Sequence, residues 1–129
     1  MTFNLFITGA IYSSQASYSA LQFCRAALER GHEISQVFFY QDGVTQGTSL
    51  SVPLSDEFDS VAEWHNLAQQ ADIDLVVCVS AAERRGVLDQ TQALEHGRDS
   101  SNLHSSFKIA GLGELHAASL ESDRMVSFK

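Results

Sequence analysis

Short apolar runs alternate along the chain with longer segments in which apolar residues recur at helical spacing. Three short segments are mostly apolar over their whole length, which is typical of parallel strands covered on both faces. They are Phe3–Ile7, Ile34–Tyr40 and Ile73–Val79. Two shorter strands are predicted at Phe107–Ile109 and Arg124–Phe128. The pattern therefore predicts five strands.

Two long helices are expected among the first three strands. Gln15–Arg30 carries small and apolar residues, Cys24 among them, at the spacing of a helix with one core face. Gly31 is a suitable stop for that helix. The next helix is expected to open at Ser55, with acidic residues in its first turn.

The second half of the chain has weaker signals. Ser80-Ala81-Ala82-Glu83 matches a capping box, which predicts a short helix starting at Ser80. Leu112–Leu120 is expected to be a helix, Val87–Asn102 a polar and partly helical segment, and Gly43–Leu54 a polar loop.

Alternation of strands with helices predicts βαβ units and a mainly parallel sheet. No internal repeat, linker or low-complexity tract interrupts the 129 residues. The expected fold is therefore a single α/β domain over residues 1–129, with three layers and a flavodoxin-like arrangement.

The composition of the chain argues against some classes of function. Eight basic residues against sixteen acidic ones give a net charge of −8, whereas direct binding to nucleic acid needs a basic surface. No apolar run approaches the roughly 20 residues that span a bilayer, and the N-terminal segment does not resemble a signal peptide. We expect a cytoplasmic protein with no membrane and no direct nucleic-acid partner.

Two cysteines and five scattered histidines match no zinc spacing, so no metal and no cofactor are expected.

The two cysteines occupy different places. Cys24 falls on the apolar stripe of a helix, where a thiol behaves as a small hydrophobic group. Cys78 ends a central strand, at the edge where α/β sheets carry their functional crevices, and lies two residues before the expected helix start at Ser80. Thiols in such positions are more acidic than free cysteine, so Cys78 is the candidate catalytic residue.

A single activated thiolate can attack an acyl group, reduce a peroxide or accept a sulfur atom as a persulfide. Acyl transfer also needs a histidine and an oxyanion hole, and the sequence places no histidine beside Cys78. Sulfur transfer needs only an acidic, accessible thiol and a docking surface. Tyr12, Ser80 and Arg84 are expected to line the same crevice, and Arg85 is a further source of positive charge.

Two alternatives stay open at this point. The hydroxyl-rich segment Thr8–Gln15 favours a non-catalytic scaffold or a small-ligand binder, although it has no GxGxxG or Walker lysine. The chain could also be a structural subunit whose chemistry lies in a paralogue.

Six segments, in this order, resemble the DsrE/DsrF-like sulfur-relay family, and within it the TusD group. The more specific ones are the block that starts at Cys78 and the later Gly-Leu-Gly block. The segments are Thr8–Tyr12, Gly31–Tyr40, Cys78–Val87, Ser101–Leu103, Gly111–Leu115 and Asp123–Phe128.

The resemblance implies a sulfurtransferase whose active cysteine corresponds to Cys78. It implies a heterohexamer with TusB-like and TusC-like paralogues, a TusA-like sulfur donor and a TusE-like acceptor. The sulfur would end in the 2-thio group of the wobble uridine of tRNA.

Overall fold

Five parallel strands form the central layer of the computed structural model, which describes all residues 1–129. In chain order the elements are β1 (Thr2–Ile7), α1 (Ala16–Glu29), β2 (Glu33–Phe39), a 3₁₀ helix (Gln41–Gly47), α2 (Ser60–Ala71), β3 (Asp74–Cys78), α3 (Val79–Arg84), α4 (Gln90–Glu95), β4 (Phe107–Ala110), α5 (Leu112–Glu121) and β5 (Arg124–Phe128). The strand order is β4-β3-β2-β1-β5, with every neighbouring pair parallel.

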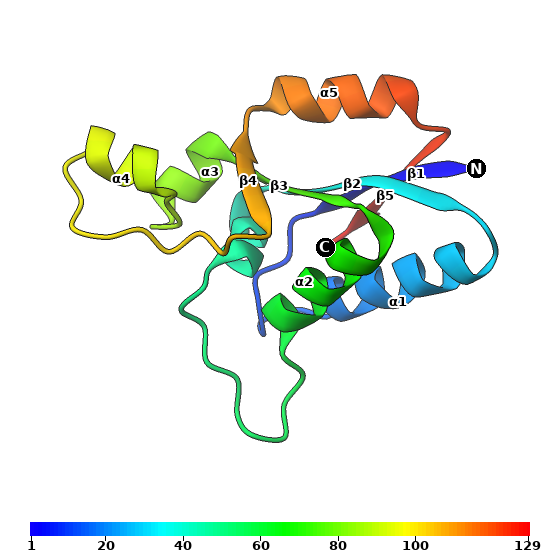
Figure 1. Ribbon diagram of the computed structural model, residues 1–129, viewed down its shortest axis with the longest axis horizontal. Coiled ribbons are helices and arrows are strands. Elements are labelled where there is room, and N and C mark those ends of the chain that lie inside the picture. Colours follow the sequence, from blue (N-terminus) through cyan, green and yellow to red (C-terminus); the bar gives the residue numbers. More distant parts are fainter.

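Helices cover both faces of this sheet. Figure 1 shows α1 and α2 together on one face and α5 alone on the other, while α3 and α4 extend beyond the sheet on the β3–β4 side. The predicted α/β fold with a parallel sheet and three layers is confirmed.

The core lies mainly between the sheet and the α1–α2 layer. Trp64 of α2 packs edge-on against Phe39 of β2, with ring centroids 5.4 Å apart, and both side chains are fully buried. Leu21 and Cys24 of α1 belong to the same cluster. By contrast, α5 buries none of its residues, so the two faces of the sheet are covered very unequally.

Two expectations about the segment after β2 were wrong. Helix α2 begins at Ser60 rather than near Ser55, because the Asp59 carboxylate accepts a hydrogen bond from the Ala62 amide at 3.1 Å and caps the helix there. The expected loop Gly43–Leu54 starts inside the 3₁₀ helix, in which Gln46 is fully buried.

The expected helix start at Ser80 was also wrong. Helix α3 follows β3 without a loop, and Cys78 itself is the N-cap, so Ser80 lies inside the first turn. The Glu83 carboxylate does not reach back to the cap, because it accepts hydrogen bonds from Gln92 and His96. A capping box forms instead at α4, between Asp89 and Gln92.

Candidate functional site

The carboxyl ends of the parallel strands bring four connections to one edge of the sheet. Among them, the passage from β3 to α3 places Cys78 both at the end of a strand and at the start of a helix. Its backbone is extended, with φ −67° and ψ 127°, and its side chain makes no capping hydrogen bond. The unpaired amides of the first turn of α3 therefore begin directly after this residue.

The Cys78 thiol lies just beneath the surface. Its Sγ is 3.7 Å from the hydroxyl of Ser80, which is exposed. The Cys78 side chain is nevertheless only 1% exposed and belongs to the apolar core cluster. The accessible thiol expected from the sequence is thus not seen in this structure, because apolar packing covers it.

The Cys78 side chain points to the face of the sheet that α5 crosses. Gln36 and Asp74 pair in register and line a cavity of about 180 Å³ together with residues of α5. Side chains alternate along a strand, so Cys78, four residues after Asp74, shares that face. Its register partner on β4 is Ala110.

Cys24 has the surroundings expected of a structural thiol. It is fully buried in α1. Burial raises the pKa of the Cys24 thiol to about 12, and the nearby positive charge of Arg25 offsets only part of this effect. A thiol with such a pKa is almost entirely protonated at neutral pH, and the thiolate is the nucleophile.

Arg84, the last residue of α3, and Arg85, its C-cap, differ in their partners. Arg85 donates to an Asp42 carboxylate oxygen at 2.8 Å and to the Ala81 carbonyl at 3.2 Å. This ion pair connects α3 to the 3₁₀ helix and balances the charge of Arg85. Arg84 is exposed and forms no ion pair, so it is the arginine of α3 whose charge is not balanced within the chain.

Tyr12 lines a different cavity from the one expected. Its backbone is left-handed, with φ 62°, and it borders a cavity of about 220 Å³. Burial raises the pKa of the Tyr12 hydroxyl; a hydrogen bond with the Ser60 backbone opposes this, and the carboxylates of Asp59 and Glu57 add to it. The other lining residues are Ser14, Gln15, Ser17, Tyr18, Phe58 and Ser60, so Cys78 is not part of this cavity.

A buried chain of hydrogen bonds closes the inner wall of that cavity. The Trp64 indole donates to Ser17 Oγ at 2.6 Å, Ser17 Oγ lies 2.8 Å from Ser60 Oγ, and Ser60 donates to Gln46 Oε1 at 2.7 Å. Gln46 in turn donates to the Gly9 carbonyl at 3.3 Å. This network could not be predicted from the sequence, since its members belong to segments that are distant along the chain.

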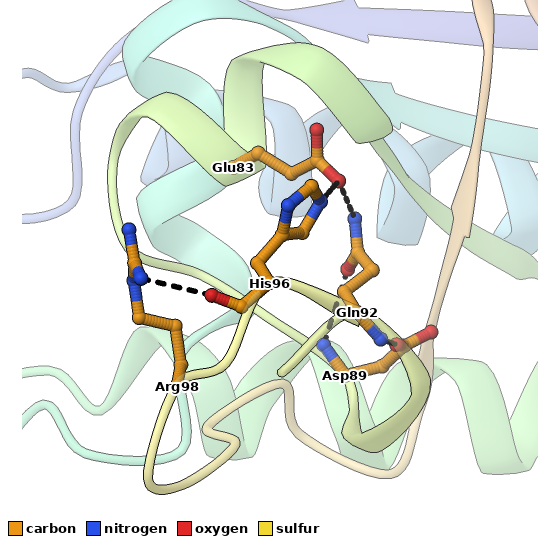
Figure 2. A network of polar contacts seen from close by, with 5 residues as sticks. All are labelled: Glu83, Asp89, Gln92, His96 and Arg98. Carbon is orange, nitrogen blue, oxygen red and sulfur yellow. Dashed lines mark hydrogen bonds and ion pairs between the residues drawn. The ribbon is translucent and has the colours of Figure 1, made fainter. Parts of the chain in front are cut away.

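Helix α3 is fixed at its far end by a cluster of polar contacts with α4 (Figure 2). One Glu83 carboxylate oxygen accepts from Gln92 at 3.0 Å and lies 2.9 Å from His96 Nε2. The hydrogen bonds from His96 and Gln92 lower the pKa of Glu83. Because α3 carries Cys78 at its start, these contacts help to set the direction of the helix that follows the thiol.

No cluster of three or more histidine, cysteine, aspartate or glutamate side chains is arranged to hold a metal ion. None of the helices combines the length and the apolar character that crossing a membrane requires.

Known proteins with the same fold define the class of this chain. The model of the DsrE/DsrF-like family matches residues 1–128, and the chain belongs to that family. The chain is 48% identical over 128 residues to a protein of Vibrio parahaemolyticus named Sulfurtransferase TusD homolog, covering 99% of this chain and 98% of that one. It is 49% identical, with the same coverage, to the DsrE protein of Allochromatium vinosum.

The fold itself has a counterpart among crystal structures. The ychN protein from E. coli superimposes with a TM-score of 0.76 at 20% sequence identity, and the match covers 99% of each chain. At this level of identity the likeness concerns the architecture of the chain.

Proposed function

We propose that this protein is a sulfurtransferase in which Cys78 carries sulfur as a persulfide. The observation that carries the proposal is the contrast between the two thiols. Cys78 stands at the sheet edge as the N-cap of α3, whereas Cys24 lies inside α1, where burial raises its pKa to about 12. A relative that is 48% identical bears the name of a sulfurtransferase, which supports the same activity.

The proposed step needs only one thiolate and leaves the oxidation states balanced. The Cys78 thiolate attacks the outer sulfur of a donor persulfide, the donor S–S bond breaks, and the donor leaves as a thiolate. The proton of the original Cys78 thiol ends on the donor or in solvent. In the second step, an acceptor thiolate attacks the outer sulfur on Cys78, and the Cys78 thiolate is released.

The proposal includes partners. A TusA-like protein would supply the sulfur and a TusE-like protein would take it, for 2-thiolation of the tRNA wobble uridine. The chain would act within a heterohexamer with TusB-like and TusC-like paralogues. Sequence segments typical of the TusD group and the names of the Vibrio relatives support this choice.

The burial of Cys78 adds a requirement to the proposed step. A nucleophile must meet the outer sulfur of another macromolecule, and a side chain that is 1% exposed cannot do so without local movement. The thin α5 layer lies on the face to which Cys78 points, and it buries none of its residues. Weakly packed elements of this kind open at low free-energy cost.

The alternative of a small-ligand binder has one feature in its favour, the cavity beside Tyr12. Its volume of about 220 Å³ is below the roughly 300–1,000 Å³ of most ligand pockets. The hydroxyls of Ser17 and Ser60 in its wall already bond to each other and to neighbours within the chain. These facts favour the sulfur-transfer proposal.

The test is the level of 2-thiouridine in the tRNA of a bacterial strain that lacks this chain. Wild-type protein is expected to restore the modification, and Cys78→Ser is expected to fail although it accumulates as folded protein. The matched control, Cys24→Ser, is expected to restore it. Normal thiolation with Cys78→Ser would instead identify the chain as a structural subunit.

A further inference from the structure

Two amide side chains are buried beneath α5 without hydrogen-bond partners. Asn4 of β1 is fully buried, and Gln36 of β2 is only 4% exposed. Both polar atoms of the Asn4 amide, Nδ2 and Oδ1, and the Oε1 atom of Gln36 make no hydrogen bond. Buried polar atoms in this condition are rare in folded proteins, because each of them loses its bonds to water and gains none within the chain.

The two amides are neighbours on one face of the sheet. Asn4 and Gln36 pair in register on adjacent parallel strands. Phe6 and Phe38, two residues further along the same strands, stack with ring centroids 6.3 Å apart, as expected when alternate residues of both strands share a face. Gln36 borders the cavity of about 180 Å³ that residues of α5 also line, so this is the face that α5 crosses (Figure 1).

Helix α5 is held on this face by few contacts. Two of the α5 residues that border the cavity with Gln36 are Ala117 and Ala118, whose side chains carry no polar atom for the amides to bond. The Glu114 carboxylate of α5 lies 3.6 Å from Lys108 Nζ of β4, but both side chains are about half exposed, and exposed ion pairs stabilise a fold little. Because α5 also buries none of its residues, little opposes its opening.

Opening of α5 gives the two amides the partners that they lack. With the helix in place, the polar atoms of Asn4 and Gln36 are shielded from water, and with the helix lifted, water can bond to them. The lost hydration of these amides therefore disfavours the closed arrangement alone. Helix α5 follows closely after Ala110, the register partner of Cys78, so its opening also uncovers the face beside the thiol.

We propose that Asn4 and Gln36 form a conformational device that keeps α5 close to opening, and this inference rests on the proposed function. The two amides lower the free-energy cost of lifting α5, and they thereby set how often the buried Cys78 thiol becomes reachable for a sulfur donor. They act through the helix and not on the thiol. Gln36 pairs with Asp74, which precedes Cys78 by four residues, or roughly 13 Å along the strand.

The test replaces each amide with an apolar side chain of similar size, in Asn4→Leu and in Gln36→Met. Asn66→Leu and Gln69→Met make the same changes at exposed positions of α2 and are the matched controls. Hydrogen exchange of the α5 amides is measured by mass spectrometry on each native protein. The rate at which Cys78 gains sulfur from glutathione persulfide is measured on the same samples, and melting temperatures verify the fold.

Exchange of the α5 amides is expected to slow by about tenfold in Asn4→Leu and in Gln36→Met, equivalent to ~1.4 kcal/mol. Loading of Cys78 should slow by a similar factor, and neither variant should melt below wild type. Both controls should exchange and load like wild type.

Three results would contradict parts of this account. Exchange of α5 as fast as in wild type, or faster, would overturn the device, since the amides would then be bonded in the closed fold, for instance to a buried water. Slower exchange with unchanged loading would overturn their role in access to Cys78. Failure of wild-type Cys78 to load, with α5 exchange slowed in both variants, would instead overturn the proposed function.

Discussion

The two cysteines of the chain lie in different structural positions. Cys24 fills a place in the apolar face of α1, where burial disfavours the thiolate. Cys78 stands at the boundary of a strand and a helix, one residue away from the first amides of α3. The sequence is enough to predict this contrast, since helical spacing identifies one position and the end of an apolar run identifies the other.

The reactivity of Cys24 follows directly from its surroundings. With a pKa of about 12, about one thiol in ten thousand is ionised at pH 8. We therefore expect iodoacetamide to leave Cys24 unmodified in the native protein at pH 8, while Cys78 is alkylated. Peptide mass spectrometry over a time course measures both rates. Equal rates in the native protein would contradict this assignment, and equal rates in urea are the expected control.

At the scale of elements, the short helix α3 depends on its neighbour α4. Glu83 joins them by accepting hydrogen bonds from His96 and Gln92 (Figure 2). The sequence pattern suggested a different use of Glu83, in a capping box with Ser80. Pattern alone could not decide between these uses, because the competing partners approach from a separate helix.

The hydrogen bonds that Glu83 accepts between α3 and α4 make the stability of the fold depend on pH, and the sign of this dependence follows from the pKa shift. The pKa of Glu83 is lower in the folded protein than the ordinary pKa of a glutamate. The contribution of Glu83 to stability is therefore fully present when the pH is above that ordinary pKa. That contribution is lost as the pH falls through the lowered pKa. We expect Glu83→Gln to lower the urea midpoint at pH 6, and the difference from wild type to disappear toward pH 3.

The matched control for Glu83→Gln is Glu95→Gln, since Glu95 is exposed on α4 and forms no ion pair. Its urea midpoint should follow that of wild type at every pH. A Glu83→Gln midpoint that differs from wild type by the same amount at pH 3 and pH 6 would rule out the carboxylate as the source of the effect.

At the scale of the whole molecule, the two faces of the sheet differ in how firmly they are covered. The α1–α2 layer contributes Leu21, Cys24 and Trp64 to the core, whereas α5 buries no residue. We expect hydrogen exchange to be much faster in the amides of α5 than in those of α1, because local opening of α5 exposes little apolar surface. Exchange mass spectrometry on the native protein measures this. Equal protection of the two helices would remove the proposed route to Cys78.

The sequence predicted the architecture well, because mostly apolar runs and helical spacing reflect burial on a scale of a few residues. It predicted the start of α2 poorly, since Ser55 and Asp59 are both suitable caps by residue type and only the fold selects Asp59. It could not predict that Cys78 is covered, or that Gln46 is buried in a hydrogen-bonded chain. Both depend on contacts between segments that are distant along the chain.

Sulfur carried on Cys78 can be measured directly as a change in peptide mass. Wild type, Cys78→Ser and Cys24→Ser are incubated with glutathione persulfide, and their peptides are analysed by mass spectrometry without reduction. A gain of about 32 Da, one sulfur atom, is expected on the peptide that contains Cys78, in wild type and in Cys24→Ser only. A gain on the Cys24 peptide with an unmodified Cys78 peptide would contradict this expectation.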